Sequence, residues 1–136
     1  MSISTVSHLS IRKQATSKQL FAPIAQRYVV RTYQSGTSWY EVYNDGWLRQ
    51  GGYVTSGTST NITTTYIVPM LNTGYTLIAT GESNSTNAPS YNHIGYISRT
   101  STSMIMNVQP ALSKNWIAEG YGDSAAVKAR GANPSY

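Results

Sequence analysis

From Tyr28 onward, hydrophobic and polar residues alternate in short runs. A period of two residues is typical of β-strands with one face buried, whereas helices repeat every three to four residues. The candidate strands are Tyr28–Tyr33, Ser38–Tyr43, Asn61–Val68, Tyr75–Thr80, His93–Arg99, Ser103–Val108 and Lys114–Tyr121. Several of these runs are apolar on both faces. This pattern predicts a packed core on one side of the strands and a contact between subunits on the other.

The strongest local signal is the Asn-Asp-Gly sequence at 44–46. Three loop residues that end in glycine favour a type I turn followed by a left-handed residue, which is the hairpin with a bulge. In this register Glu41 lies opposite Arg49, and Trp39 lies opposite Gly51. An opposite-charge pair across a hairpin is favourable, so the chemistry of the pairs supports this loop over a two-residue one.

Composition points to the same fold class. The chain has 136 residues, enough for one domain, with only 11% charged residues. It contains 18 Ser, 16 Thr and 11 Tyr but no Cys. Branched and aromatic residues fit a pleated surface, so we expect an all-β, antiparallel β-sandwich. Without cysteine, disulfides, thiolate metal sites and cysteine nucleophiles are excluded.

The charge distribution divides the chain. Residues 1–31 hold five basic residues and no acidic residue, although the net charge of the whole chain is only +5. We therefore expect a basic N-terminal arm at 1–27, a β-sandwich at 28–122 and a polar C-terminal tail at 123–136. The arm is either a solvated tail or a docking segment. Five charges are sparse for an arm that binds nucleic acid, so nucleic-acid binding is disfavoured.

Sequence features that would direct the chain to a membrane are missing. The N-terminal residues lack the basic and apolar regions of a secretory signal. No apolar run approaches the ~20 residues that span a bilayer. We expect synthesis in a cytoplasm and no membrane insertion.

Catalytic motifs are weak. The only histidines are His8 and His93, so a Ser-His-Asp triad needs His93 with Asp45 or Asp123. No nucleophile elbow, phosphate-binding loop or dinucleotide fingerprint occurs, and no spacing suggests a metal site. We predict no catalysis, no cofactor and no metal. A carboxylate pair formed across a subunit interface remains the open alternative.

Binding of a neutral glycan fits the residue types better. Such ligands need aromatic walls and a few placed amide or hydroxyl groups. The longest polar loop, with its flanking residues, supplies both. The candidate binding residues are Glu82, Asn84, Asn87, Tyr91, Asn92 and His93.

The stretch Trp39–Gly52 resembles the C-terminal receptor-binding domain of bacteriophage tail fibres, where an aromatic pair, a turn with Asp-Gly-Trp and then Gln-Gly-Gly recur. Later segments are similar in the same order, so that the resemblance covers roughly residues 33–121. These segments are Tyr66–Met70, Asn72–Leu77, His93–Tyr96, Thr100–Ile105 and Asn115–Tyr121.

The resemblance implies a homotrimeric β-sandwich tip on the virion surface that binds a host-surface glycan or protein and has no catalytic activity. The arm would dock to another virion protein. Its docking residues would be Arg12, Lys13, Lys18 and Phe21. Three alternatives stay open: a capsid or tail decoration (head fibre) protein without a receptor, a glycan-degrading tail enzyme, and a nucleic-acid-binding capsid subunit.

Overall fold

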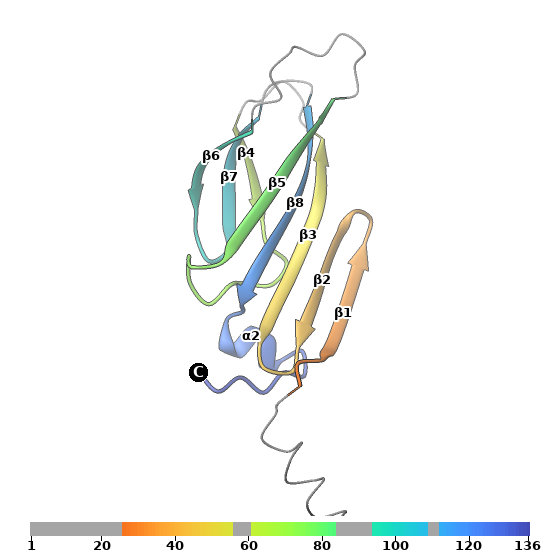
Figure 1. The fold of residues 1–136 in the computed structure, drawn as a ribbon, viewed down its shortest axis with the longest axis vertical. Coiled ribbons are helices and arrows are strands. Elements are labelled where there is room, and N and C mark those ends of the chain that lie inside the picture. Colours follow the sequence, from red (N-terminus) through yellow and green to blue (C-terminus); the bar gives the residue numbers. More distant parts are fainter. Residues whose placement is uncertain (1–25, 56–60, 84–93, 109–111) are drawn as a thin grey trace, which may run out of the picture.

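The structure, a computed structural model, describes residues 26–55, 61–83, 94–108 and 112–136. These residues form two β-sheets packed in layers, with one short helix near the C-terminus (Figure 1). The elements are β1 (Val29–Ser35), β2 (Ser38–Tyr43), β3 (Trp47–Thr55), β4 (Asn61–Thr65), β5 (Thr76–Ser83), β6 (Ile94–Arg99), β7 (Ser103–Val108), β8 (Leu112–Tyr121) and α2 (Ser124–Lys128).

The larger sheet has the strand order β1-β2-β3-β8-β5, and the smaller sheet has the order β4-β7-β6. All of these strand pairings are antiparallel. The prediction of an all-β antiparallel sandwich is therefore confirmed. The predicted homotrimer stays a prediction.

The core lies between the two layers. It combines alternate residues of the strands with residues from the β4–β5 connection and from the C-terminal segment. Its buried hydrophobic residues are Tyr40, Val42, Leu48, Tyr66, Val68, Met70, Tyr75, Met104, Met106, Trp116, Ala118, Val127 and Ala132. Of the three tryptophans, Trp116 belongs to this core, whereas Trp39 and Trp47 are half-buried on the outer face of the larger sheet.

The β2–β3 hairpin has the predicted register. Glu41 pairs with Arg49 and Trp39 pairs with Gly51. Gly46 has a φ of 90°, the left-handed conformation that the three-residue loop requires. A side chain there would also collide with the ring of Tyr136, which packs against the loop. Both local conformation and packing therefore favour glycine at this position.

The predicted strand Asn61–Val68 is shorter in the structure, because β4 ends at Thr65. The chain then crosses between the sheets, and the backbone of Val68 bonds to a side chain instead of a strand. Gln50 Nε2 donates to the Val68 carbonyl at 2.7 Å, and Gln50 Oε1 accepts from the Val68 N–H at 3.1 Å. The predicted alternation of buried residues nevertheless continues through Tyr66 to Met70.

The segment expected to be a polar tail is instead part of the fold. Residues 124–128 form α2, and Val127 is fully buried against the sandwich. Farther along, the Asn133 N–H donates to the Asn44 carbonyl, and the Tyr136 hydroxyl donates to the Gly122 carbonyl. Small residues allow this segment to pack closely, so its polar composition does not make it a loose tail.

Asp123 caps α2 and offers a simple test of this correction. Its Oδ2 accepts from the Ala126 N–H at 3.0 Å. We expect Asp123→Ala to lower the free energy of unfolding by about 1 kcal/mol, the usual value of an N-cap. Urea denaturation at constant protein concentration measures it. Asp123→Asn, which keeps the acceptor, should stay close to the native chain; an equal loss in both variants would contradict the capping role.

Candidate functional site

The two ends of the sandwich carry different parts of the chain. Three connections start and finish at one end, which we call the distal end (Figure 1). They are the connections from β3 to β4, from β5 to β6 and from β7 to β8. The register confirms this clustering, since Thr55 pairs with Ser113, Ser83 with Leu112 and Ile94 with Val108. Gln26, α2 and the C-terminus lie at the opposite, proximal end.

The predicted binding residues map to the distal connections. Glu82 belongs to β5 and pairs with Ser113 of β8. The other five predicted residues fall in 84–93, between the distal ends of β5 and β6, and lie outside the described residues. They are Asn84, Asn87, Tyr91, Asn92 and His93. The predicted docking residues Arg12, Lys13, Lys18 and Phe21 also lie outside the described residues.

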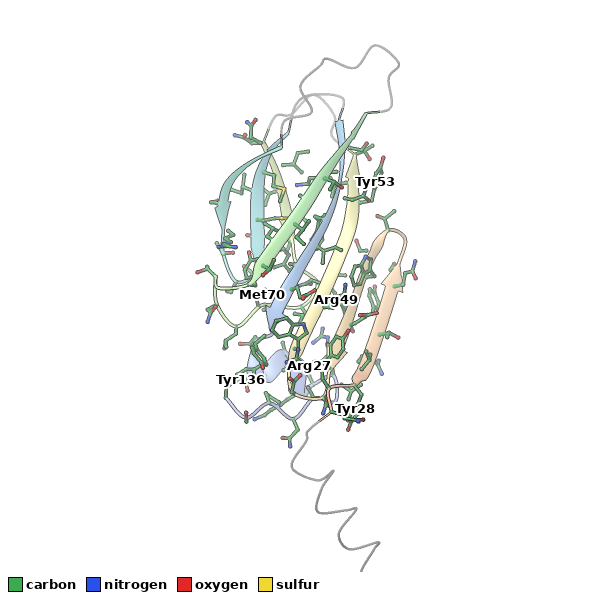
Figure 2. All side chains as sticks on the ribbon, in the orientation of Figure 1. Arg27, Tyr28, Arg49, Tyr53, Met70 and Tyr136 are labelled. Atoms are coloured by element: carbon green, nitrogen blue, oxygen red, sulfur yellow. The ribbon has the colours of Figure 1, made fainter. Side chains whose placement is uncertain are left out.

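At the proximal end, Arg27 fixes the point where the N-terminal arm enters the domain (Figure 2). Its guanidinium forms a salt bridge of 2.7 Å with Asp45 and lies 4.6 Å from the centroid of the Trp47 ring. The hydrogen bond with Asp45 raises the pKa of Arg27 above its ordinary value. Tyr121 stacks edge-on against both Trp47 and Tyr136. Arg27 is therefore held in an aromatic cluster that also contains the C-terminal Tyr136.

An ion network crosses the outer face of the larger sheet. Arg49 Nε donates to Glu119 Oε2 at 2.9 Å, and Arg49 Nη1 lies 3.5 Å from Glu41 Oε2. Tyr43 also donates its hydroxyl to Glu41 Oε2. Hydrogen bonding to Tyr43 and to Glu119 raises the pKa of Arg49, so its charge is secure. The sequence predicted the Glu41–Arg49 pair but not Glu119, which comes from β8.

Two hollows lie over strands of the larger sheet. One, of about 320 Å³, lies over β1 and β2 and is lined by residues 32–34 and 39–41. We call it the hairpin groove. The other, of about 110 Å³, is a mostly apolar recess over β5 and β8 beside Ile78 and Ile117. Ile78 is 57% exposed, unusually high for a strand isoleucine. Sequence reasoning missed the hairpin groove because its lining is ordinary strand sequence.

Four carboxylates in the described part of the chain have structural partners. Glu41 and Glu119 contact Arg49, Asp45 contacts Arg27, and Asp123 caps α2. The triad considered from sequence would need Asp45 or Asp123, and both lie at the proximal end. Strand β6, which begins at Ile94 directly after His93, starts at the distal end. Within the described ranges, no three metal-ligating side chains gather as a metal site, and no helix is long and apolar enough to cross a bilayer.

No family model and no curated protein matches this chain. Solved structures do. An N-truncated R1-type pyocin tail fibre has a TM-score of 0.56 with 14% sequence identity, covering 79% of this chain and 95% of that chain. A C-terminal fragment of the P. aeruginosa R1 pyocin fibre has a TM-score of 0.51 with 14% identity, covering 71% of this chain and 28% of that chain. The chain has the fold of a pyocin tail fibre.

The predicted resemblance to a tail-fibre tip is therefore confirmed at the level of the fold. The tail-fibre fold covers most of the present chain but only part of the longer fibres. This chain spans 38% of an N-truncated R2-type pyocin tail fibre and 26% of a C-terminal R2 fibre fragment. The ligands and assembly partners of a whole fibre can therefore only be proposed for this chain.

Proposed function

We propose that this protein is a tail-fibre or receptor-binding tip of a phage-like particle and adheres to a host-surface glycan. The observation that carries the proposal is the separation of the two ends on a tail-fibre fold. The N-terminal arm enters at the proximal end, whereas the predicted binding segment joins the distal end. An arm docked to another virion protein would therefore point the distal connections away from the particle.

A homotrimer is part of this proposal. Ile78 exposes apolar surface beside the apolar recess, and its strand partner Ile117 is half-buried there. Exposed apolar surface of this kind is typical of interaction sites. A closed trimer would also bind a repetitive surface through three sites at once, so that its avidity would exceed the affinity of a single subunit. Light scattering behind a sizing column should give about three times the mass of the 14.9 kDa chain.

Substitutions in the distal segment test the adhesive role. We expect the combined change of Asn84, Asn87 and Tyr91 to alanine to reduce adsorption of particles to host cells by at least about tenfold, because aromatic and amide contacts carry such interfaces. The readout is the fraction of particles left unbound. Thr73→Ala, in the exposed turn before β5, is the matched control and should adsorb normally.

Other outcomes identify the alternatives. Normal adsorption of the distal variant, combined with less stable particles, would overturn adhesion and favour a decoration protein. Release of reducing sugar from host polysaccharide would identify a glycan-degrading enzyme. An intact particle that lacks this protein after the combined change of Arg12, Lys13 and Lys18 to alanine would support docking through the arm.

A further inference from the structure

We propose that the hairpin groove is a lateral subsite for the pyranose ring of a neutral sugar, separate from the distal segment. This inference rests on the proposed function, because it assigns a second contact to the same class of receptor. The groove holds about 320 Å³, at the lower end of the range for small-molecule sites. That size suits one sugar ring of a longer chain.

Four of the six residues that line the groove share one face of the hairpin. Thr32 pairs with Glu41, and Gln34 pairs with Trp39. Because successive side chains in a strand point to opposite faces, these four stand together on the outer face of the hairpin. Tyr33 and Tyr40, which also line the groove, alternate with these four along the strands and stack their rings at 5.1 Å between centroids. The lining of the groove therefore combines aromatic residues with an aliphatic hydroxyl, an amide and a carboxylate.

Glu41 is held in place with one oxygen left for a ligand. Its Oε2 accepts from the Tyr43 hydroxyl at 3.2 Å and lies 3.5 Å from Arg49 Nη1. Its Oε1 has no hydrogen-bond partner among the described residues. A fixed carboxylate oxygen beside a groove is a good acceptor for sugar hydroxyls. Because Tyr43 and Arg49 already hold the Glu41 side chain, binding a sugar would cost little additional side-chain entropy.

Trp39 provides a fixed apolar wall. A β-carbon at position 51 would come within 2.8 Å of Trp39 Cζ2, so the indole lies close over the backbone of Gly51. Trp39 is only half-buried, which leaves part of the ring at the surface. Aromatic surface next to a few fixed polar groups is the combination that sugar rings require, because their C–H faces are apolar and their edges carry hydroxyls.

The charge of the groove selects the kind of sugar. Glu41 would repel a carboxylate- or sulfate-bearing ring, whereas Gln34 and Thr32 offer uncharged hydrogen bonds. A neutral pyranose is therefore preferred over an acidic one. The apolar recess at Ile78 and Ile117 has few polar groups and suits a protein surface better.

The three tryptophan indole N–H groups provide the test, because an amide correlation spectrum resolves them separately. The full chain is titrated with the methyl glycosides of glucose, galactose and mannose, and with glucuronate. We expect at least one neutral glycoside to shift the Trp39 signal saturably at millimolar concentration. The signals of Trp47 and Trp116 should stay in place, and glucuronate should have little effect.

Variants define the contacts. Gln34→Ala should weaken binding roughly threefold to tenfold, the effect of one uncharged hydrogen bond. Glu41→Gln should weaken neutral sugars and relax the discrimination against glucuronate, because the repelling charge is removed. Ser35→Ala lies on the same hairpin outside the groove lining and is the matched control.

Each other outcome counts against the subsite. A Trp39 signal unmoved by all the neutral glycosides would overturn it, and the proposed function would still stand if the distal variant lost adsorption. A shift by glucuronate equal to that by the neutral sugars would also overturn it. A lower native mass of Gln34→Ala would show that a second copy of the chain fills the groove. Unchanged adsorption of the distal variant would instead remove the proposed function itself.

Discussion

Replacing Lys114 with methionine should stabilise the protein at neutral pH by about 3 kcal/mol. Lys114 is fully buried on the inner face of β8, and its Nζ has no hydrogen-bond partner in the described part of the structure. Its strand neighbours on that face are Val54 and Gly81, neither of which is polar. Burial without a partner disfavours the ammonium and lowers the pKa of Lys114 from 10.5 to about 8. Methionine has a similar length and removes this cost.

The sign of the pH dependence follows from that lowered pKa. Below about pH 8 both the folded and the unfolded chain carry the proton, so the full penalty of the buried charge is present. Between about pH 8 and 10.5 only the unfolded chain keeps it. Stability therefore rises with pH through this window, by up to about 1.4 kcal/mol per pH unit for one group. Lys114→Met lacks this rise, so its advantage over the native chain should shrink as the pH approaches 10.5.

Urea denaturation at pH 7 and at pH 10, at one protein concentration, measures both effects. The tyrosines also titrate near pH 10, so the difference between variant and native chain is the useful quantity. Lys128→Met changes an exposed lysine and should have little effect at either pH. A destabilised Lys114→Met variant would contradict the prediction and indicate an anionic partner for Lys114 in the assembled protein.

The features that sequence predicted well are local ones. The β2–β3 hairpin depends on three consecutive loop residues, and its register pairs residues no more than twelve positions apart. Alternation likewise predicted most strands, because burial of one face imposes a period of two. In the predicted strand 61–68, the alternation of buried residues continues beyond Thr65, although the strand itself ends there. Hydrophobic alternation reports which residues are buried, and hydrogen bonding decides whether they form a strand.

The features that sequence missed depend on distant partners. Lys114 looks like an ordinary polar strand residue in the sequence, and its burial is visible only in the folded structure. The C-terminal segment looked like a tail because its residues are small, although Asp123 before an alanine-rich run was an available helix signal. Glu119 joins Arg49 only because β8 returns beside β3. In each case the deciding contact joins residues that are far apart in the chain.

The candidate binding residues also divide into those recognisable from local sequence and those that depend on contacts between distant segments. Their polar and aromatic types were recognisable from the sequence, and the fold adds that their segment joins the distal end. The hairpin groove was not recognisable, because its residues form two ordinary strands. Its character arises from the pairing of those strands and from the ion network that holds Glu41. A binding surface built on strands is therefore harder to find from sequence than one built on a polar loop.

The largest loss of stability should come from Gln50→Leu. Gln50 is fully buried, and its amide satisfies both the N–H and the carbonyl of Val68 where the chain crosses between the sheets. Leucine fills the space but leaves two buried backbone groups without partners. Each costs about 1–3 kcal/mol, so we expect a loss of about 2–6 kcal/mol. This is a large share of the ~5–15 kcal/mol that stabilises a typical domain.

Two measurements separate this effect from a simple packing defect. Urea denaturation gives the loss, and hydrogen exchange of the Val68 amide should become faster than that of amides in β8. Leu48→Met, on the same inner face of β3, changes core shape without removing a hydrogen bond, and it should cost less than about 1.5 kcal/mol. If Gln50→Leu cost no more than Leu48→Met, water would be replacing the Gln50 amide at Val68. A full loss would instead identify Gln50 as the side chain that holds the crossing segment between the two sheets.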